Sequence, residues 1–410
     1  MLSARMRTVL GRCLGAAAVA AVWALAGCGH GNYTQEHLSA AEEKMAIMKS
    51  ATEWEMARQS FLTGDFDKAL KGVNRSLAIS PKVAKSHVLK GRILMELSDL
   101  EGAIASFNEA LVCDEKNVEA TYHLGLVYER MLERDKALAQ YQKASELDPQ
   151  APQYVIATAE MLIDLGRIDE ARTVVESRTG AFANNAGVKQ TLGHIAMLQD
   201  RKDDAVSLFN QARLLAPDDL TLIEDLTRAQ VAAGKYGEAE ANLSRLMAAE
   251  ANAGRRDLKL MRARCLVEID RPLEARELII KLTQDDEGGS DVESWILLGN
   301  LSYSLKDANR TRLSAQRVIG LAPDRPEGYI LRGLQQRRQG QYDAAAESFN
   351  EATKHDKTGN SLVLLGLAQR DMGNMSLAAA SFREALNRDP SNAQAQRLLN
   401  SSVASVSTDD

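Results

Sequence analysis

A pair of small residues twelve positions apart recurs along most of the chain. The second member is alanine at nine places and threonine at one: Ala57 and Ala69, Gly91 and Ala103, Gly125 and Ala137, Ala159 and Ala171, Gly193 and Ala205, Thr227 and Ala239, Ala263 and Ala275, Gly299 and Thr311, Gly333 and Ala345, Gly366 and Ala378. Successive pairs begin 34, 34, 34, 34, 34, 36, 36, 34 and 33 residues apart. A fixed period in the range of about 20 to 50 residues is typical of a chain built from stacked copies of one unit.

The repeated unit is predicted to be a helical hairpin. Residues 123–149, "HLGLVYERMLERDKALAQYQKASELDP", contain two amphipathic helical patterns separated by the polar stretch "LERD". The small residues Gly125, Ala137 and Ala144 allow two antiparallel helices to approach closely. Pro149 ends the second helix because proline lacks an amide hydrogen. One hairpin cannot bury its apolar face alone, so neighbouring units must stack.

This pattern resembles the tetratricopeptide repeat. The segments "LGHIAMLQDRKDDAVSLFNQARLLAP" (192–217) and "LGLAQRDMGNMSLAAASFREALNRDP" (365–390) carry the small, alanine, aromatic and proline positions of that family. The resemblance covers about residues 50 to 390 and implies an all-α fold, a right-handed superhelical solenoid of about ten antiparallel helix pairs with first helices lining a concave groove. Two positions depart from the pattern: Arg178 replaces a small residue in repeat four, and Thr311 replaces alanine in repeat eight.

The resemblance also implies where a partner would bind. Residues that contact bound peptide in this family commonly come from positions two, five, nine and twelve of each first helix. The groove contacts expected here occupy positions five and nine: Trp54, Arg58, Val88, Arg92, Tyr122, Arg228, Leu260 and Arg264. Arginine binds carboxylates through two hydrogen bonds and stacks on planar groups, which suits a protein segment. The alternative is that the arginines are solvated or paired with acidic residues such as Glu160 and Glu224. The lysine and asparagine clamp of chaperone-binding members is absent.

The N-terminal segment 1–27 resembles the signal peptide of bacterial lipoproteins. Arg5, Arg7 and Arg12 precede an apolar run that ends in "LAGC", and this motif matches the lipobox. The resemblance implies cleavage before Cys28, diacylglycerol on its sulfur and acylation of the new amino group. The protein is then expected to be lipid-anchored to a bacterial cell-envelope membrane. Gly29 in place of an aspartate favours the periplasmic face of the outer membrane.

Other roles for the leader and its cysteine remain as alternatives. The uncharged run from Cys13 to Gly29 is at the short limit for a membrane-spanning helix, so an uncleaved anchor and an ordinary secretory signal are both possible. "CGH" (28–30) lacks the four ligands of a structural zinc site. Cys113 and Cys265 are expected to be buried small apolar residues, because an elongated fold keeps residues so distant in sequence apart.

Charge and motifs argue against nucleic-acid binding and catalysis. The net charge is −6, and removal of the leader with its three arginines leaves −9 on the mature chain. No broad basic face is therefore available for phosphates. The sequence contains no GxxxxGK[ST], HExxH, GxSxG or CxxC motif, and its histidines are scattered over different repeats. We expect no enzyme activity, no metal, no cofactor besides the lipid, and no small-molecule substrate.

The predicted organisation follows the repeat. It comprises a signal peptide (1–27), a lipidated linker (28–34), an N-terminal helix (35–49), repeats one to six (50–253), repeat seven with a joint (254–291), repeats eight to ten (292–390), a cap helix (391–400) and a disordered tail (401–410). The 36-residue steps fall around 249–257 and 283–291, where glycine and charged residues gather. We expect the superhelix to bend or loosen there.

Two functions fit these features. The first is a non-catalytic adaptor that binds protein segments in its groove during assembly of a cell-envelope or secretion machine. The second is an accessory subunit for polysaccharide export or modification, with the repeats contacting a synthase or glycan. Both rest on the fold and the anchor alone.

Overall fold

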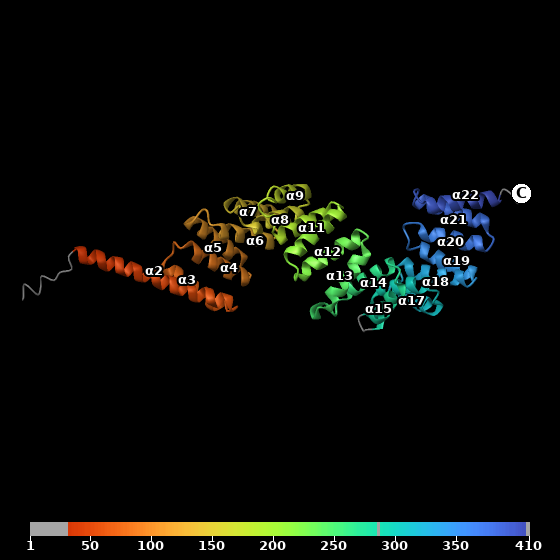
Figure 1. Cartoon of the computed structure of the whole chain (residues 1–410), viewed down its shortest axis with the longest axis horizontal. Coiled ribbons are helices and arrows are strands. Elements are labelled where there is room, and N and C mark those ends of the chain that lie inside the picture. The colour runs from red at the N-terminus through yellow and green to blue at the C-terminus, as the bar shows by residue number, and fades with distance from the viewer. Residues whose placement is uncertain (1–31, 285–287, 407–410) are drawn as a thin grey trace, which may run out of the picture. The chain divides into compact units, whose positions relative to one another are not determined.

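The computed structural model describes residues 32–284 and 288–406 of the 410-residue chain. Over these residues the fold is all-α, with 21 α-helices and two short 3-10 turns (Figure 1). The elements are α2 (Asn32–Leu62), α3 (Phe66–Ile79), α4 (Ala84–Glu96), α5 (Leu100–Cys113), α6 (Val118–Arg130), α7 (Arg134–Leu147), α8 (Pro152–Asp164), α9 (Ile168–Glu176), α10 (Ala186–Leu198), α11 (Lys202–Leu215), α12 (Leu220–Ala232), α13 (Tyr236–Ala248), η1 (Glu250–Asn252), α14 (Arg256–Glu268), α15 (Pro272–Gln284), η2 (Gly288–Ser290), α16 (Val292–Ser304), α17 (Ala308–Leu321), α18 (Pro326–Arg338), α19 (Tyr342–Thr353), α20 (Asn360–Asp371), α21 (Met375–Arg388) and α22 (Ala393–Val406).

The described helices do not include a membrane span, since none of them combines sufficient length with sufficient apolar character. The predicted signal peptide (1–27) and the predicted lipidation site Cys28 lie outside the described residues.

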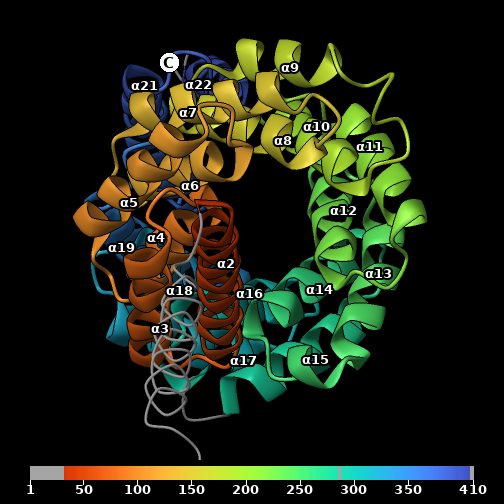
Figure 2. The same cartoon turned by 90° about the vertical axis from the view of Figure 1, so that its left-hand side faces the viewer.

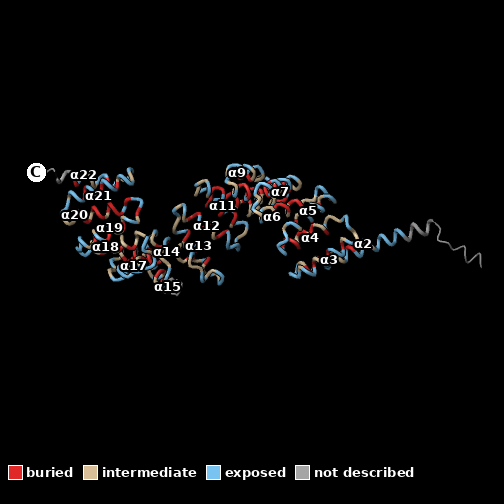
Figure 3. Tube along the Cα trace, turned by 180° about the vertical axis from the view of Figure 1, so that it is seen from behind, coloured by how far each residue is buried: buried red, intermediate tan, exposed pale blue. Residues whose placement is uncertain are grey.

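The chain divides into two compact units, between Thr191 and Leu192 inside α10. In the first unit α2 packs on α3, α4 on α5, α6 on α7 and α8 on α9. Figures 1 and 2 show α2 lying beside α3. The second unit repeats this pairing from α12 and α13 to α20 and α21, and α22 packs on α21. The buried residues line the helix sides that face neighbouring helices (Figure 3). Each unit is therefore a tetratricopeptide-like stack of helix pairs, as the sequence predicts.

Five hairpins close where a glycine of the first helix meets an aromatic ring of the second. A Cβ atom added to Gly91 would lie 2.5 Å from the Phe107 ring, which is fully buried. Four further pairs repeat this contact: Gly125 with Tyr141, Gly193 with Phe209, Gly333 with Phe349, and Gly366 with Phe382. Packing at this density leaves no room for a side chain at the glycine. The close approach expected from small residues is thus confirmed at these five hairpins.

The turn between the two helices of each hairpin has one residue with positive φ. These residues are Gly64, Ser98, Leu132, Gly166, Asp200, Gly234, Asp270, Lys306, Gly340 and Gly373. Their spacing reproduces the sequence period, including both 36-residue steps. Five of the ten are glycine, the residue that adopts this conformation without steric cost. The ten hairpins are therefore built on one backbone geometry that the sequence specifies only in part.

Repeat four departs from the others in its second helix. Helix α9 has only nine residues and ends at Glu176, two positions before Arg178. Arg178 therefore lies in the turns that follow, which explains why a large side chain is accepted where the family has a small one. The division into two units comes soon after this irregular repeat. At the two long steps, η1 lies just before the predicted joint (254–291) and η2 lies within it, and whether the superhelix bends there stays a prediction.

Both ends of the predicted repeat region need correction. Helix α2 begins at Asn32, inside the predicted linker (28–34), and runs without a break past the predicted boundary at residue 49. The segment contains no glycine or proline and is rich in alanine, glutamate and methionine, which favour helix.

At the other end, α22 continues to Val406, so the predicted disordered tail (401–410) is wrong for residues 401–406. Leu398 and Leu399 pack against the core formed by the last repeats, and Ser402 is buried. The Ser402 hydroxyl donates to the Leu398 carbonyl oxygen at 2.9 Å. Tertiary packing thus extends the helix beyond the apolar pattern. Residues 407–410 lie outside the described residues.

The two cysteines within the described ranges are free thiols in different surroundings. Cys265 is buried as predicted, and burial raises the pKa of its thiol to about 11. Cys113 is the last residue of α5 and is only half-buried, so the prediction of burial is wrong there. The end of a helix leaves a side chain with fewer neighbours than its middle.

Candidate functional site

Four of the predicted groove residues surround one hollow in the first unit. This first hollow has a volume of about 280 Å³ and lies on the first helices of three successive repeats, α2, α4 and α6. Its lining is Trp54, Arg58, Phe61, Leu62, Lys85, Val88, Leu89, Arg92 and Glu119. Trp54 and Arg58 are four residues apart, as are Val88 and Arg92, so each pair shares one face of its helix. The predicted spacing therefore gathers these side chains at one place.

Cations lie over aromatic rings in the first hollow. Lys85 Nζ lies 4.5 Å from the centroid of the Trp54 ring, and the Trp54 indole donates to the Lys85 carbonyl oxygen at 3.3 Å. The Arg92 guanidinium carbon lies 5.0 Å from the centroid of the Phe61 ring. Such contacts hold a positive charge against the negative face of a ring without neutralising it. The rings therefore position cations that keep hydrogen-bond donors for a ligand.

The arginines of the first hollow also have acidic neighbours. Arg58 Nη1 lies 2.9 Å from Glu55 Oε1, and Arg92 Nη1 lies 3.1 Å from Glu119 Oε1. The arginine side chains are 48% and 37% exposed, and both glutamates are more than half exposed. Exposed ion pairs of this kind contribute at most about 1 kcal/mol. A ligand carboxylate can therefore replace these partners at small cost.

Glu119, the acid between α4 and α6, is held in its charged form. The nearby His123 ring, with Nε2 3.8 Å from Glu119 Oε1, lowers the pKa of Glu119, and the positive charge of Arg92 lowers it further. Burial acts in the opposite direction but is the weaker influence overall. Three cations and one carboxylate thus line the first hollow, which leaves it net positive.

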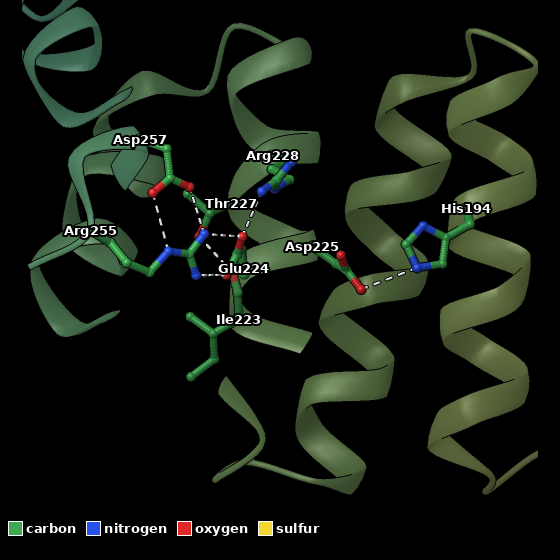
Figure 4. A network of polar contacts seen from close by, with 8 residues as sticks. All are labelled: His194, Ile223, Glu224, Asp225, Thr227, Arg228, Arg255 and Asp257. Atoms are coloured by element: carbon green, nitrogen blue, oxygen red, sulfur yellow. Dashed lines mark hydrogen bonds and ion pairs between the residues drawn. The ribbon is translucent and has the colours of Figure 1, made fainter. Parts of the chain in front are cut away.

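A second hollow lies within the second unit. It has a volume of about 390 Å³ and is lined by His194, Met197, Phe209, Thr221, Glu224, Asp225, Arg228 and Ala229. His194 Nε2 lies 3.1 Å from Asp225 Oδ2, and its ring meets the edge of Phe209 at 5.0 Å between centroids. Figure 4 shows His194 directed at Asp225 from the neighbouring helix. Arg228 Nη2 binds Glu224 Oε1 at 2.6 Å.

Arg255 ties the second hollow to the next repeat. Its guanidinium binds both oxygens of Glu224, at 2.6 and 2.9 Å, and both oxygens of Asp257, at 2.6 and 3.1 Å (Figure 4). The hydrogen bonds from Arg255 lower the pKa of Glu224 and of Asp257. Glu224 is only 18% exposed, so solvent screens this contact less than the pairs in the first hollow. The same arrangement recurs at Arg325, which binds Glu293 and Glu327 at 2.6 Å each.

Models of known protein families match three stretches of this chain. Residues 91–131 match a model described as TPR repeat, and residues 122–186 and 359–392 match models described as tetratricopeptide repeat. The chain is a tetratricopeptide-repeat protein. Proteins of this family bind protein partners and are typically non-catalytic scaffolds.

Named relatives are similar over part of their length. DnaJ homolog subfamily C member 7 from Homo sapiens is 28% identical over 169 residues, which cover 38% of this chain and 34% of the relative. A DnaJ protein P58IPK homolog from Arabidopsis thaliana is 33% identical over 113 residues, which cover 27% of this chain and 23% of the relative. This chain therefore spans about a third or less of these relatives. The crystal structure of a tetratricopeptide repeat protein from Parabacteroides merdae is 17% identical, with a TM-score of 0.44, and covers 62% of this chain and 99% of that chain.

The structure places the other predicted groove residues at separate locations. Arg228 lines the second hollow. Tyr122 packs against Tyr141 and Tyr154, with ring centroids 5.6 and 5.2 Å away. Leu260 packs against the core formed by α14 to α17. Arg264 Nη2 lies 3.5 Å from Glu293 Oε2. Whether any of these residues contacts a ligand stays a prediction.

Several residues of the two hollows were not predicted. Lys85 and Glu119 occupy position two of their first helices, a position that the family pattern includes, so the register alone could have indicated them. Asp225 and His194 make a contact between two helices that no spacing within one helix reveals. Arg255 lies in one of the 36-residue steps, and its partner Glu224 comes from the preceding repeat.

Three of the histidines, His87, His123 and His355, take part in local contacts. The His123 ring stacks on Phe107 at 5.5 Å, and the His355 ring stacks on Tyr329 at 5.8 Å. His87 Nε2 lies 2.7 Å from the Pro81 carbonyl oxygen. Across residues 32–284 and 288–406, histidine, cysteine, aspartate and glutamate do not form a group of three or more that could hold a metal ion.

Proposed function

We propose that this tetratricopeptide-repeat protein is an adaptor of the bacterial cell envelope that binds a segment of a partner protein over the first hollow. The observation that carries the proposal is the gathering of Trp54, Arg58 and Arg92 at one hollow, with Lys85 beside them. Its net positive charge and half-buried rings suit a segment that carries carboxylates and flat side chains. The assembly of an envelope or secretion machine would use such an adaptor to hold one component near another.

The proposal includes a lipid anchor at Cys28. Two or three acyl chains would give stable membrane attachment, where a single chain gives only marginal attachment. Cys28 and Asn32, the start of α2, are four residues apart, so the chain between them reaches at most about 14 Å. The first repeats would then work close to the bilayer, on the periplasmic face of the outer membrane.

Photo-crosslinking in living cells tests the binding site. Leu62 lines the first hollow and is 60% exposed, so a photoreactive amino acid placed there should capture the partner. The same amino acid at Val112, which is 80% exposed on the second helix α5, is the control position. A partner recovered equally from both positions would contradict the assignment.

Charge reversal sharpens the same experiment. Arg58→Glu with Arg92→Glu should reduce crosslinking from Leu62 about tenfold or more, as expected for residues that carry much of a binding energy. Lys68→Glu with Lys71→Glu makes the same change of charge at exposed positions of α3 and should leave the yield unchanged. Equal losses in both variants would show a dependence on net charge alone. A captured glycan in place of a protein would favour the role in polysaccharide export.

A Cys28→Ser variant tests the anchor separately. We expect the variant to leave the membrane fraction after cell lysis and to escape processing by the lipoprotein pathway. Normal processing and continued membrane attachment would refute the lipid anchor without touching the proposal for the first hollow.

A further inference from the structure

The N-terminal half of α2 extends beyond the body of the first repeat. Residues 39–49 are all exposed except Ala46, which is half-buried. Packing begins at Ser50, which is buried and whose hydroxyl donates to the Ser76 carbonyl oxygen of α3 at 3.0 Å. An isolated helix of about this length is only marginally stable in water. A further contact would therefore stabilise this part of α2.

One side of this helix carries exposed methionines. Met45 and Met48 are each 70% exposed, and Met56 is 52% exposed. Ala41, Met45, Met48 and Thr52 are separated by four, three and four residues, the spacing of a coiled-coil seam, and Met56 follows four residues later. We call these five residues the methionine stripe. An exposed apolar row of this kind marks an interaction surface.

Met45 of the methionine stripe faces away from Trp54 of the first hollow. Trp54 is nine residues from Met45, which is two and a half turns at about 3.6 residues per turn. The two residues therefore lie on opposite sides of α2, and a partner on the stripe leaves the first hollow accessible.

The charges beside the stripe indicate what covers it. Glu42 and Lys49 flank one edge, and Lys44 flanks the other. When two copies of the helix pair antiparallel with Met45 against Met48 of the second copy, Glu42 lies beside Lys49 of that copy. The twofold symmetry repeats the contact, so one surface supplies two opposite-charge pairs. A parallel pairing would instead place Lys44 beside Lys49 of the copy, which is repulsive.

We propose that α2 is a self-association helix, whose methionine stripe packs antiparallel against the stripe of a second copy of this chain. Methionine fills irregular gaps and suits an interface that forms and separates. One helix from each copy buries an area at the low end for specific interfaces, so the dimer forms at high protein concentration.

Charge exchange tests this dimer. Sedimentation velocity measures the dimer fraction of the purified full-length chain, kept in one detergent throughout so that any acyl chains stay shielded. Glu42→Lys or Lys49→Glu alone places like charges at both symmetric contacts, and each should weaken dimerisation about tenfold. Combining Glu42→Lys with Lys49→Glu exchanges the charges and should restore the wild-type dissociation constant. Lys44→Glu is the matched control and should have little effect, because Lys44 lies beside Ala51 of the copy.

Every result of this series bears on the proposal. A chain that stays monomeric at all concentrations, or a double variant that fails to regain dimerisation, overturns it. Stronger association of Lys44→Glu would indicate parallel helices and also overturns it. A monomer that binds phosphatidylcholine vesicles, and loses this binding with Met48→Ser, would assign the stripe to a membrane surface instead. Far-UV circular dichroism and the midpoint of thermal unfolding should show that the packed repeats are intact in all variants, because the substituted residues are exposed and lie outside them.

Discussion

The two hollows occupy the same kind of position in their units but differ in chemistry. Both are lined mainly by first helices, and both contain an arginine at position nine. The first hollow is net positive, with cations over the rings of Trp54 and Phe61. The second hollow is instead lined by two carboxylates, Glu224 and Asp225, and by one arginine, Arg228. One backbone repeat thus presents two different surfaces, and the side chains alone determine what each can bind.

Exposure separates the two hollows further. Glu119, the acid of the first hollow, is 54% exposed, whereas Glu224 and Asp225 are 18% and 15% exposed. A shielded carboxylate that is bound by arginine is costly to remove, while an exposed one exchanges readily. The comparison indicates that the second hollow stabilises the stack of repeats and that the first is open to a partner.

The largest loss of stability is expected at a glycine–aromatic contact that lies beside both hollows. Gly91 beside the first hollow and Gly193 beside the second both lie against an aromatic ring, and an added Cβ would be 2.5 and 2.6 Å from it. Replacing either glycine by valine should destabilise its hairpin by about 3 kcal/mol, because backbone and ring must move apart. Hydrogen exchange in the two helices of each hairpin measures the local loss. Gly237, with open space around its Cβ position, provides the control substitution by valine. Equal losses at Gly237 would show that packing is not the cause.

The next largest loss of stability should differ between the two hollows. Glu224→Gln removes the charge that holds Arg255 and Arg228, and we expect a loss of about 1 to 2 kcal/mol in the stability of α12 and α14. Glu119→Gln removes an exposed pair and should cost less than about 0.5 kcal/mol. Guanidinium chloride would screen these charges, so urea is the denaturant for this comparison. A larger loss from Glu119→Gln than from Glu224→Gln would contradict the assigned roles.

Lowering the pH should destabilise the second hollow in the same way as Glu224→Gln. Arg255 holds the pKa of Glu224 below its ordinary value of 4.5, so folding is stabilised above that pH and the contribution is lost as the pH falls through the folded-state pKa. The wild type should therefore lose stability in α12 and α14 below about pH 4, as hydrogen exchange would show. Glu224→Gln should lose less over the same range, because only Asp257 of the pair then titrates. An unchanged pH profile in the variant would exclude Glu224 as the titrating group.

Most of the fold was predictable because packing at the repeat positions is local. The glycine and aromatic positions of one hairpin are close in sequence, so the period alone indicates which residues meet. The ends were less predictable. The extension of α22 to Val406 depends on Leu398 and Leu399 packing on the last repeats, and the stretch "SSVASV" (401–406) gives no sign of that contact. The start of α2 before residue 35 was also missed, although the segment contains no glycine or proline to end a helix.

The candidate site was predictable only within one helix. Trp54 with Arg58, and Val88 with Arg92, follow from helical spacing and gather as expected. The contact of Asp225 with His194 and that of Glu224 with Arg255 cross between helices, and residue distance along the chain does not determine them. Leu260 shares the register position of the groove residues, and its half-buried side chain packs against the core of its own and the next repeat, so its contact with a ligand stays a prediction.

The smallest predicted effect concerns the turns that support the two hollows. The turn between α2 and α3 has glycine at the positive-φ position, Gly64 with φ 78°, whereas the turn between α10 and α11 has Asp200 with φ 58°. Asp200→Gly should stabilise its hairpin by about 0.5 to 1 kcal/mol, since only glycine adopts this conformation freely. Gly64→Ala should destabilise the first hairpin by about 1 kcal/mol, although nothing lies within 4 Å of the added Cβ. Hydrogen exchange in α10 and α11, and in α2 and α3, measures both changes.

Asp200 also lies 3.0 Å from Lys202, so Asp200→Asn serves as the control that removes this ion pair but keeps the backbone preference. If Asp200→Asn stabilises the hairpin as much as Asp200→Gly, charge and not φ accounts for the gain, and the two turns differ for a reason other than backbone strain.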